Sequence, residues 1–204
     1  MEQMSLSRVE RRKEKTRRML IEGALELFYE KGLHWTKVED ITERADVGKG
    51  TFYRHFETKE ALIQEILQQG FDALLARIQE AVQSPAPNGS PAHAVIQAQL
   101  SFYLQHPEYL LLFHQVRGLL QMRSESVKEL RDVYNGYLAR LALIVRPALG
   151  GTTRPISSAR ELAMALSAFT SGLLIDHLLF DKGDVRGRRD TLQAQLERSI
   201  QALM

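Results

Sequence analysis

One stretch, residues 36–56 (TKVEDITERADVGKGTFYRHF), constrains the fold more than any other part of this 204-residue chain. Its first half carries apolar residues at the spacing of one helix face: Val38, Ile41 and Ala45. An Asp-Val-Gly sequence interrupts that pattern, and its valine is expected to fill the corner between two elements. Phe52 and Phe56, four residues apart, then define the inner face of a second helix. The spacing therefore predicts two short helices joined by a tight turn.

The outer face of the second helix is basic and rich in hydroxyl groups. Its side chains are those of Lys49, Thr51, Tyr53, Arg54 and His55. An apolar inner face with such an outer face suits a helix that lies in the major groove of DNA. At the start of the first helix, Thr36 is expected to be the N-cap, with Glu39 as its capping-box partner.

The same stretch has two other interpretations. The sequence Gly-Lys-Gly-Thr at 48–51 resembles part of a phosphate-binding loop, but that loop needs Ser or Thr directly after the lysine and a glycine five residues before it. Here Gly50 follows the lysine and Arg44 holds the upstream position, so the loop is excluded. A helical hairpin whose charges only face solvent stays open on spacing alone.

The segment VEDITERADVGKGTFYRHFETKEAL resembles the DNA-binding signature of the TetR (tetracycline-repressor-like) family of bacterial one-component regulators, over about residues 16–67. The matching positions are Ala45, Val47, Lys49, Gly50, Thr51, Tyr53, Phe56 and Lys59. Gly48 stands where the family often has Ser, which removes one hydroxyl contact. The resemblance implies an all-α fold of about nine helices. An N-terminal three-helix helix-turn-helix DNA-binding domain precedes a C-terminal helical ligand-binding and dimerisation domain.

The candidate DNA contacts fall into two groups. Lys49, Thr51 and Tyr53 are expected to face the groove after Gly48 at the start of the helix, with Lys49 and Thr51 nearest the base edges. The resemblance implies that four residues lie near phosphates: Thr36, Tyr53, His55 and Lys59. Lys59 also opens the next predicted helix, whose amino terminus favours an anion. Between residues 8 and 18, seven Lys or Arg outnumber two Glu, and beside a helix-turn-helix such a run is expected to meet phosphates.

Composition excludes several classes of protein. The chain has no cysteine, which rules out disulfides, thiolate metal sites and a cysteine nucleophile and fits a cytoplasmic location. No histidine spacing predicts a metal site, and no nucleophile turn or Gly-rich loop after a strand predicts an enzyme or a cofactor. The longest uncharged run of interest, 162–175, is shorter than the ~20 residues that cross a bilayer, so no membrane contact is expected.

Helix signals divide the rest of the chain. Beyond the helix-turn-helix, helices are predicted over 8–31, from Thr58 to 83, and over 92–105, 107–120, 124–146, 156–181 and 188–203. The first domain is assigned to residues 1–60 and the second to 61–204, with the boundary inside the helix that starts after Thr58. The single tryptophan, Trp35, is expected to pack at the edge of the first domain's core.

Aromatic residues of the second domain predict a pocket for a small organic effector of unknown identity. Buried tyrosines need hydrogen-bond partners, and a mostly apolar cavity with a few polar groups would supply them. The candidate ligand-binding residues are Phe102, Tyr103, Phe113, Tyr134, Tyr137 and His177. The family that the chain resembles usually has such a cavity here, and this implies a repressor that a ligand releases from double-stranded operator DNA. A ligand-independent architectural DNA-binding protein is the alternative.

A homodimer is expected through the segments 156–181 and 188–203. A twofold interface is self-complementary, so one face of these two helices serves both subunits. Small residues would allow close approach and larger apolar residues would supply buried area: Ala163, Ala165, Leu166, Ser167, Ala168, Phe169, Gly172, Leu173, Leu192, Leu196 and Ile200.

Overall fold

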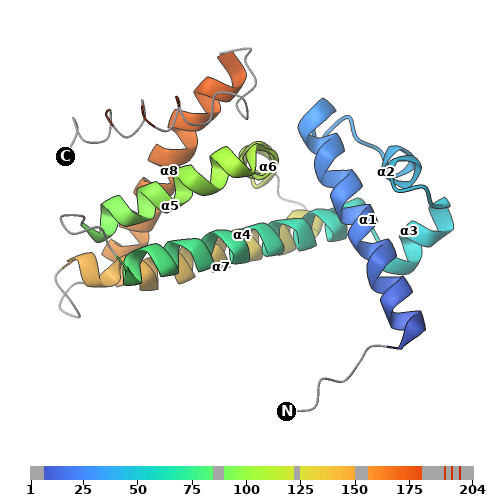
Figure 1. Ribbon diagram of the computed structural model, residues 1–204, viewed down its shortest axis with the longest axis horizontal. Helices are drawn as coiled ribbons and strands as arrows, with labels where there is room; N and C mark the ends of the chain where they lie inside the picture. The colour runs from blue at the N-terminus through green and yellow to red at the C-terminus, as the bar shows by residue number, and fades with distance from the viewer. Residues whose placement is uncertain are drawn as a thin grey trace. The chain divides into compact units, whose positions relative to one another are not determined.

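A computed structural model describes residues 7–84, 90–121, 125–149 and 156–180, together with the single positions 191, 194 and 198. Every regular element in these ranges is helical, which confirms the predicted all-α class (Figure 1). Contacts divide the chain into two compact units, residues 1–66 and 67–204. None of the described helices is both long enough and apolar enough to cross a membrane.

The first unit contains α1 (Arg8–Lys31), α2 (Val38–Arg44), α3 (Lys49–His55) and the beginning of α4 (Lys59–Gln83). A capping box starts α1, because the Ser7 side chain accepts from the Glu10 amide and the Glu10 carboxylate accepts from the Ser7 amide. Gly32 ends α1 at a φ of 87°, a left-handed conformation that glycine adopts without steric cost. Both limits of α1 were predicted.

The predicted cap of α2 is wrong. Lys37 is the N-cap, and its amide donates to Oδ2 of Asp40 at 2.7 Å. Thr36 is instead buried, and its hydroxyl donates to the carbonyl oxygens of Gly32 (2.8 Å) and Leu27 (3.3 Å). The sequence pattern could not distinguish a threonine that caps α2 from a threonine buried just before it. In both cases the hydroxyl lies one or two residues before the helix.

The core of the first unit is formed by the apolar faces that the sequence predicted. Ile41 and Phe52 are fully buried, and Phe56 is 4% exposed. Trp35 is an exception: it lies in the turn between α1 and α2 and is 78% exposed, so its predicted place in the core is wrong. Smaller residues fill that region, with Leu33 and Thr36 turned inward on either side of the exposed indole.

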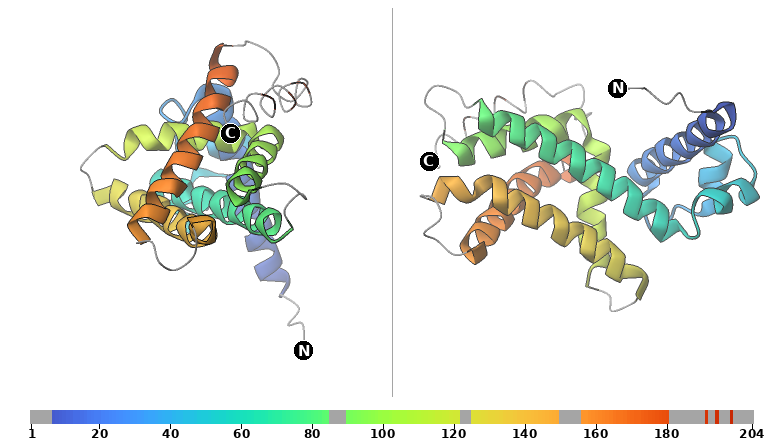
Figure 2. Two further views of the ribbon diagram at one scale, coloured as in Figure 1. Left: turned by 90° about the vertical axis from the view of Figure 1, so that its left-hand side faces the viewer. Right: turned by 90° about the horizontal axis from the view of Figure 1, so that it is seen from below.

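The second unit contains the remainder of α4, α5 (Pro91–Gln105), α6 (Pro107–Leu119), α7 (Glu125–Val145), a short 3₁₀ helix (Arg146–Leu149) and α8 (Ile156–Phe180). Proline opens both α5 and α6, where its missing N–H leaves no bond unmade. α8 packs against α5, α6 and α7, and Figure 2 shows it crossing α5 and α7. The predicted helix over 188–203 lies outside the described residues, apart from three isolated helical positions.

Candidate nucleic-acid interface

The second helix of the predicted pair, α3, separates an apolar face from a polar one. Phe52 is fully buried, whereas Tyr53 is 49% exposed and Lys49 and Arg54 are exposed. Thr51 and His55 are half-buried at the border between the two faces. The predicted outer face is therefore present as one surface of basic, hydroxyl and aromatic groups.

The turn before α3 fixes the angle between the two helices. Asp46 adopts a φ of 52°, and the amide of Val47 donates to the carbonyl oxygen of Thr42 at 2.9 Å. Gly48 is the N-cap of α3 in an extended conformation, and a Cβ placed there would meet no atom within 4 Å. No contact among the described residues requires glycine at this position, and its exposed backbone can be approached closely from outside.

Two polar contacts organise the exposed face of α3. Nζ of Lys49 donates to Oε1 of Glu39 on α2 at 2.5 Å. A guanidinium nitrogen of Arg54 donates to Oγ1 of Thr51 at 2.9 Å. Glu39 holds the pKa of Lys49 above its usual value, so the ammonium stays charged at neutral pH. The sequence pattern predicted the cations but missed Glu39 as the partner of Lys49.

Two predicted phosphate contacts have side chains directed into the fold. The Thr36 hydroxyl is buried against carbonyl groups, as described above. Nζ of Lys59 donates to the carbonyl oxygens of Thr36 at 3.0 Å and Leu33 at 3.1 Å. Lys59 thus holds the α1–α2 connection, and the contribution of Thr36 to any outer surface is limited to its backbone.

Arg17 is a structural residue that the sequence analysis placed among the phosphate-facing cations. Its guanidinium forms an ion pair with Glu65 on α4 and donates to the carbonyl oxygen of His55 at 3.1 Å. The guanidinium carbon also lies 4.5 Å from the centre of the Phe56 ring. Arg17 therefore joins α1 to the carboxyl end of α3. Neighbouring cations on α1, including Arg12 and Lys13, are exposed.

His55, the last residue of α3, is electrostatically constrained. Burial lowers the pKa of its imidazole, and the positive charges of Arg17, Lys13 and Arg54 lower it further. Its Nδ1 atom is buried without a hydrogen-bond partner among the described residues. The ring is therefore neutral at pH 7. A neutral imidazole can contact a phosphate through one N–H donor but brings no positive charge.

The aromatic residues predicted to line a ligand pocket lie together in the second unit. Phe71 of α4, which the sequence analysis did not select, stacks on Phe113 with centroids 4.2 Å apart and on Tyr137 at 4.3 Å. Ring contacts connect five of the six predicted residues through it: Phe102, Tyr103, Phe113, Tyr134 and Tyr137. His177 is half-buried on α8. Because the rings touch, a ligand among them has to part them.

A polar group interrupts this apolar region at the centre of the second unit. Nε2 of the fully buried Gln99 donates to the Tyr137 hydroxyl at 3.2 Å and to the Ser167 hydroxyl at 3.3 Å, and the two hydroxyls are 2.8 Å apart. Oε1 of Gln99 has no hydrogen-bond partner among the described residues. Burial raises the pKa of Tyr137 to about 12, so its phenol keeps its proton. Buried acceptors are nearly always paired, so this one marks a place for a donor from water or a ligand.

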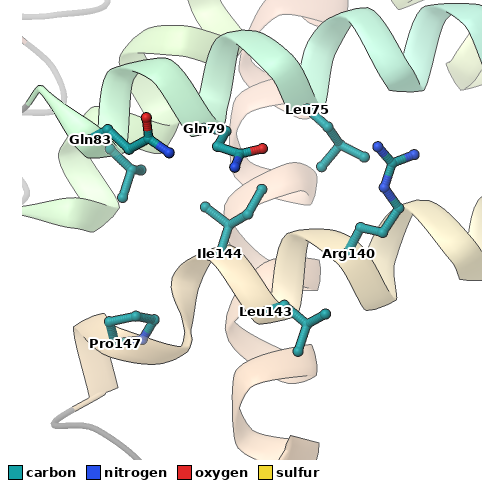
Figure 3. Close-up of a pocket in the computed structure, with 8 residues that line it drawn as sticks. Leu75, Gln79, Gln83, Arg140, Leu143, Ile144 and Pro147 are labelled. Atoms are coloured by element: carbon teal, nitrogen blue, oxygen red, sulfur yellow. The ribbon is translucent and has the colours of Figure 1, made fainter.

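A separate groove of about 400 Å³ lies between α4 and α7. Figure 3 shows Gln79 and Ile144 facing each other across it, with Arg140 near one end and Pro147 near the other. Arg140 forms an ion pair with Asp72. Leu143 on the rim is 62% exposed. No local sequence motif predicts this groove, because its walls come from two helices that are distant in sequence.

The predicted dimer helix α8 presents only part of its small and apolar residues to solvent. Met164 and Phe169 are 49% and 38% exposed, and Ala165 and Ala168 are also exposed. Three other predicted interface residues are buried within the subunit, which corrects their assignment: Ala163, Leu166 and Ser167. Leu192, Leu196 and Ile200 lie outside the described residues.

Metal ligands do not gather in the described part of the chain, where no group of three His, Asp or Glu side chains could hold an ion.

Comparisons with known proteins match the part of the chain that contains the helix-turn-helix. Residues 20–66 match the family described as bacterial regulatory proteins, tetR family. Over 67 residues the chain is 40% identical to the repressor DhaR of Mycobacterium sp. (strain GP1), covering 33% of this chain and 34% of that protein. Over 125 residues it is 29% identical to the repressor KstR2 of Rhodococcus jostii (strain RHA1), covering 58% and 61%. The match thus spans about a third and three fifths of these relatives.

Solved structures extend the likeness to most of the chain. A transcriptional regulator from Aquifex aeolicus VF5 matches 93% of this chain and 99% of its own, with a TM-score of 0.66 and 22% identity. The regulator FadR from Bacillus subtilis, in complex with stearoyl-CoA, matches 88% of this chain and 96% of its own, with a TM-score of 0.65 and 19% identity. At these identities the likeness supports the fold, including that of the second unit.

Proposed function

We propose, from the premise that residues 20–66 belong to the tetR family of bacterial regulatory proteins, that this chain is a dimeric transcriptional repressor which a small organic ligand releases from operator DNA. The observation that carries the proposal is the outer face of α3, where exposed cations, a hydroxyl and a phenol cover a helix anchored by buried phenylalanines. The curated relatives DhaR and KstR2 are named as transcriptional repressors, which favours this function over an enzymatic one.

At the DNA, α3 enters the major groove with Lys49 and Thr51 nearest the bases. Lysine donates to guanine O6 and N7, and a threonine can contact any base edge. Tyr53 and the neutral His55 donate to phosphates on either side, and Gly48 lets the backbone approach closely. The surface cations of α1 add contacts that carry no sequence information but position the domain.

Dimerisation places two α3 helices on one site. We assign the exposed face of α8, with Met164, Ala165, Ala168 and Phe169, to the interface between two copies of the chain. Support comes from the exposure of these apolar side chains on a helix whose opposite face is buried in the subunit. Two recognition helices in one dimer must reach successive major grooves, ~34–36 Å apart, so the operator is expected to be a palindrome.

Release requires a ligand that binds the DNA-incompetent form more tightly than the competent one. The region around Phe71 suits such a ligand, since its rings form an apolar wall and Gln99 offers an acceptor that no described residue pairs. A ligand that parts these rings displaces Phe71 and with it α4, the helix shared by both units. A coupling of ~1–3 kcal/mol would lower DNA affinity about 5–150-fold.

In vitro selection from a random duplex library tests the proposal. We expect the purified dimer to enrich one palindromic sequence and to bind it with a strong dependence on salt. Trp35, the only tryptophan, is exposed beside α2, so its fluorescence can report binding without a label. Binding that depends on salt but enriches no sequence would instead support the architectural alternative, and absence of DNA binding would overturn both.

The effector is then sought by native mass spectrometry of the purified dimer and by calorimetry of any molecule found, with and without operator. Reciprocity requires that operator DNA weaken binding of that molecule by the same factor by which it weakens DNA binding. Equal affinity in the two titrations would show a bound molecule that is no effector.

A further inference from the structure

Glu39 is an acidic side chain on the surface assigned to DNA. It lies on α2, its side chain is 58% exposed, and it accepts a hydrogen bond from Lys49, whose side chain is 55% exposed. DNA carries one negative charge per ~1.7 Å of helix axis, so a carboxylate here opposes binding to any duplex. Non-specific attraction to DNA therefore does not explain a carboxylate on this face.

The Glu39–Lys49 ion pair contributes little to the stability of the fold. Exposed ion pairs add little to the stability of a fold, and both partners here remain in contact with solvent. Other links already hold the two helices in place: the Arg44 guanidinium binds Glu26 and Glu30 of α1, and the amide of Val47 closes the turn to α3. The cation of Lys37 and the neutral phenol of Tyr53 lie near the pair, and both residues are exposed.

We propose that Glu39 is a specificity-determining residue, which keeps Lys49 from binding phosphates on non-operator DNA and releases it only where both side chains find bases. At the operator, Lys49 donates to guanine O6 or N7 and Glu39 accepts from the N4 amino group of cytosine. Because Nζ of Lys49 and Oε1 of Glu39 lie 2.5 Å apart before they separate, we expect the bases that they contact to be neighbours in the groove. The inference rests on the proposed function, since it requires α3 to lie in the major groove.

The pair works by an exchange of partners. Away from the operator, Glu39 neutralises Lys49. A contact between Lys49 and a phosphate would then bring no net gain in binding free energy, because the freed carboxylate would face the phosphates unpaired. At a guanine next to a cytosine, each partner loses one contact and gains another. Glu39 thus lowers affinity for all DNA but lowers it least at the correct sequence, which raises the ratio of specific to non-specific binding.

The test compares the wild type with Glu39→Gln and a matched control, Glu43→Gln. Glu43 is an exposed residue of the same helix, so both variants remove one negative charge from α2, but only Glu39 is bonded to Lys49. Fluorescence anisotropy measures binding to the selected operator and to a random-sequence duplex of the same length, over a salt series. Thermal melts confirm that both variants are folded.

We expect Glu39→Gln to bind the random duplex more tightly, with a salt slope steeper by about 0.9 for each half-site, since the freed Lys49 reaches one more phosphate. Glu43→Gln should bind only slightly more tightly and keep the wild-type ratio of operator to random affinity. A second selection with Glu39→Gln should lose the preference for cytosine beside the guanine, because glutamine favours adenine.

Either of two results overturns the inference: Glu39→Gln behaves as Glu43→Gln on the random duplex, or it selects the same bases as the wild type at every position. A wild type that enriches no sequence contradicts the proposed function instead. In that case the random-duplex titrations still decide whether the Glu39 carboxylate restrains Lys49.

Discussion

His55 combines a surface position with a depressed pKa, and this makes the first unit sensitive to acid. In the unfolded chain the imidazole takes a proton near its usual pKa of 6.5, but in the folded chain burial and three nearby cations oppose it. The unfolded state therefore binds more protons as the pH falls, and the stability present above pH 6.5 is lost as the pH drops from 6.5 through the lower pKa of the folded chain.

The prediction is that His55→Gln removes part of this acid sensitivity. Between about pH 7.5 and 5.5, the free energy of unfolding should fall less in the variant than in the wild type. Urea denaturation at several pH values measures the difference. Parallel pH profiles for the two proteins would show that His55 titrates alike in the folded and unfolded chains.

Lys59 is expected to stabilise the fold of the first unit. Its ammonium donates to the carbonyl oxygens of Leu33 and Thr36, and Lys59→Met leaves these acceptors unpaired at a cost of about 1–3 kcal/mol. Lys15→Met is the control, because Lys15 is exposed on α1 and its loss should change stability by less than about 0.5 kcal/mol. Denaturant titration measures both. The prediction would be wrong if Lys59→Met were as stable as the wild type and showed only a flatter salt dependence of DNA binding. The ammonium would then contact a phosphate of the DNA.

At the scale of elements, one close approach positions α4 against α6. A Cβ added at Gly70 would lie 2.5 Å from ring atoms of Tyr109 and 2.9 Å from Phe113, so glycine is required by the contact itself. The same rings belong to the aromatic cluster around Phe71. Tyr109 and Phe113 of α6 thereby link the aromatic cluster to the backbone of α4 at Gly70. A movement of these two rings away from Gly70 would relax the contact between the helices.

Gly70→Ala and Gly136→Ala should have opposite effects. At Gly70 the crowding of two rings costs about 1–3 kcal/mol, more than alanine gains in helix propensity. At Gly136 on α7 the added Cβ meets no atom within 4 Å, so the variant should be up to ~1 kcal/mol more stable. Thermal and urea unfolding of the two variants provide the measurement. A Gly70→Ala protein as stable as Gly136→Ala would mean that α6 yields without cost.

At the scale of the whole molecule, the proposed dimer depends on α8. Phe169→Glu places a charge on the exposed face assigned to the dimer, where it would be desolvated against its own symmetry mate. We expect a monomer at micromolar concentration in sedimentation, with weakened operator binding. Leu143→Glu makes the same change on an exposed side chain of α7 and should leave the dimer intact. Dissociation by both variants, or by neither, would place the interface elsewhere.

The sequence by itself determined the helices of both units and the two faces of the helix-turn-helix. Periodic apolar residues, prolines at helix starts and Gly32 at a helix end are local signals, and the predicted limits of α1, α5, α6, α7 and α8 agree with the structure to within one or two residues. The basic outer face of α3 followed from the same periodicity. Each of these features depends on residues only a few positions apart.

Only the tertiary structure decided which partner each polar side chain has. Thr36, Lys59 and Arg17 carried the sequence signs of phosphate contacts, yet their side chains bond groups 4 to 48 residues away within the first unit. Phe71, the Gln99–Tyr137–Ser167 contact and the groove beside Arg140 likewise join segments distant in sequence. Such contacts depend on how helices pack, and helix packing is set by the summed shape of many side chains, which no local pattern contains.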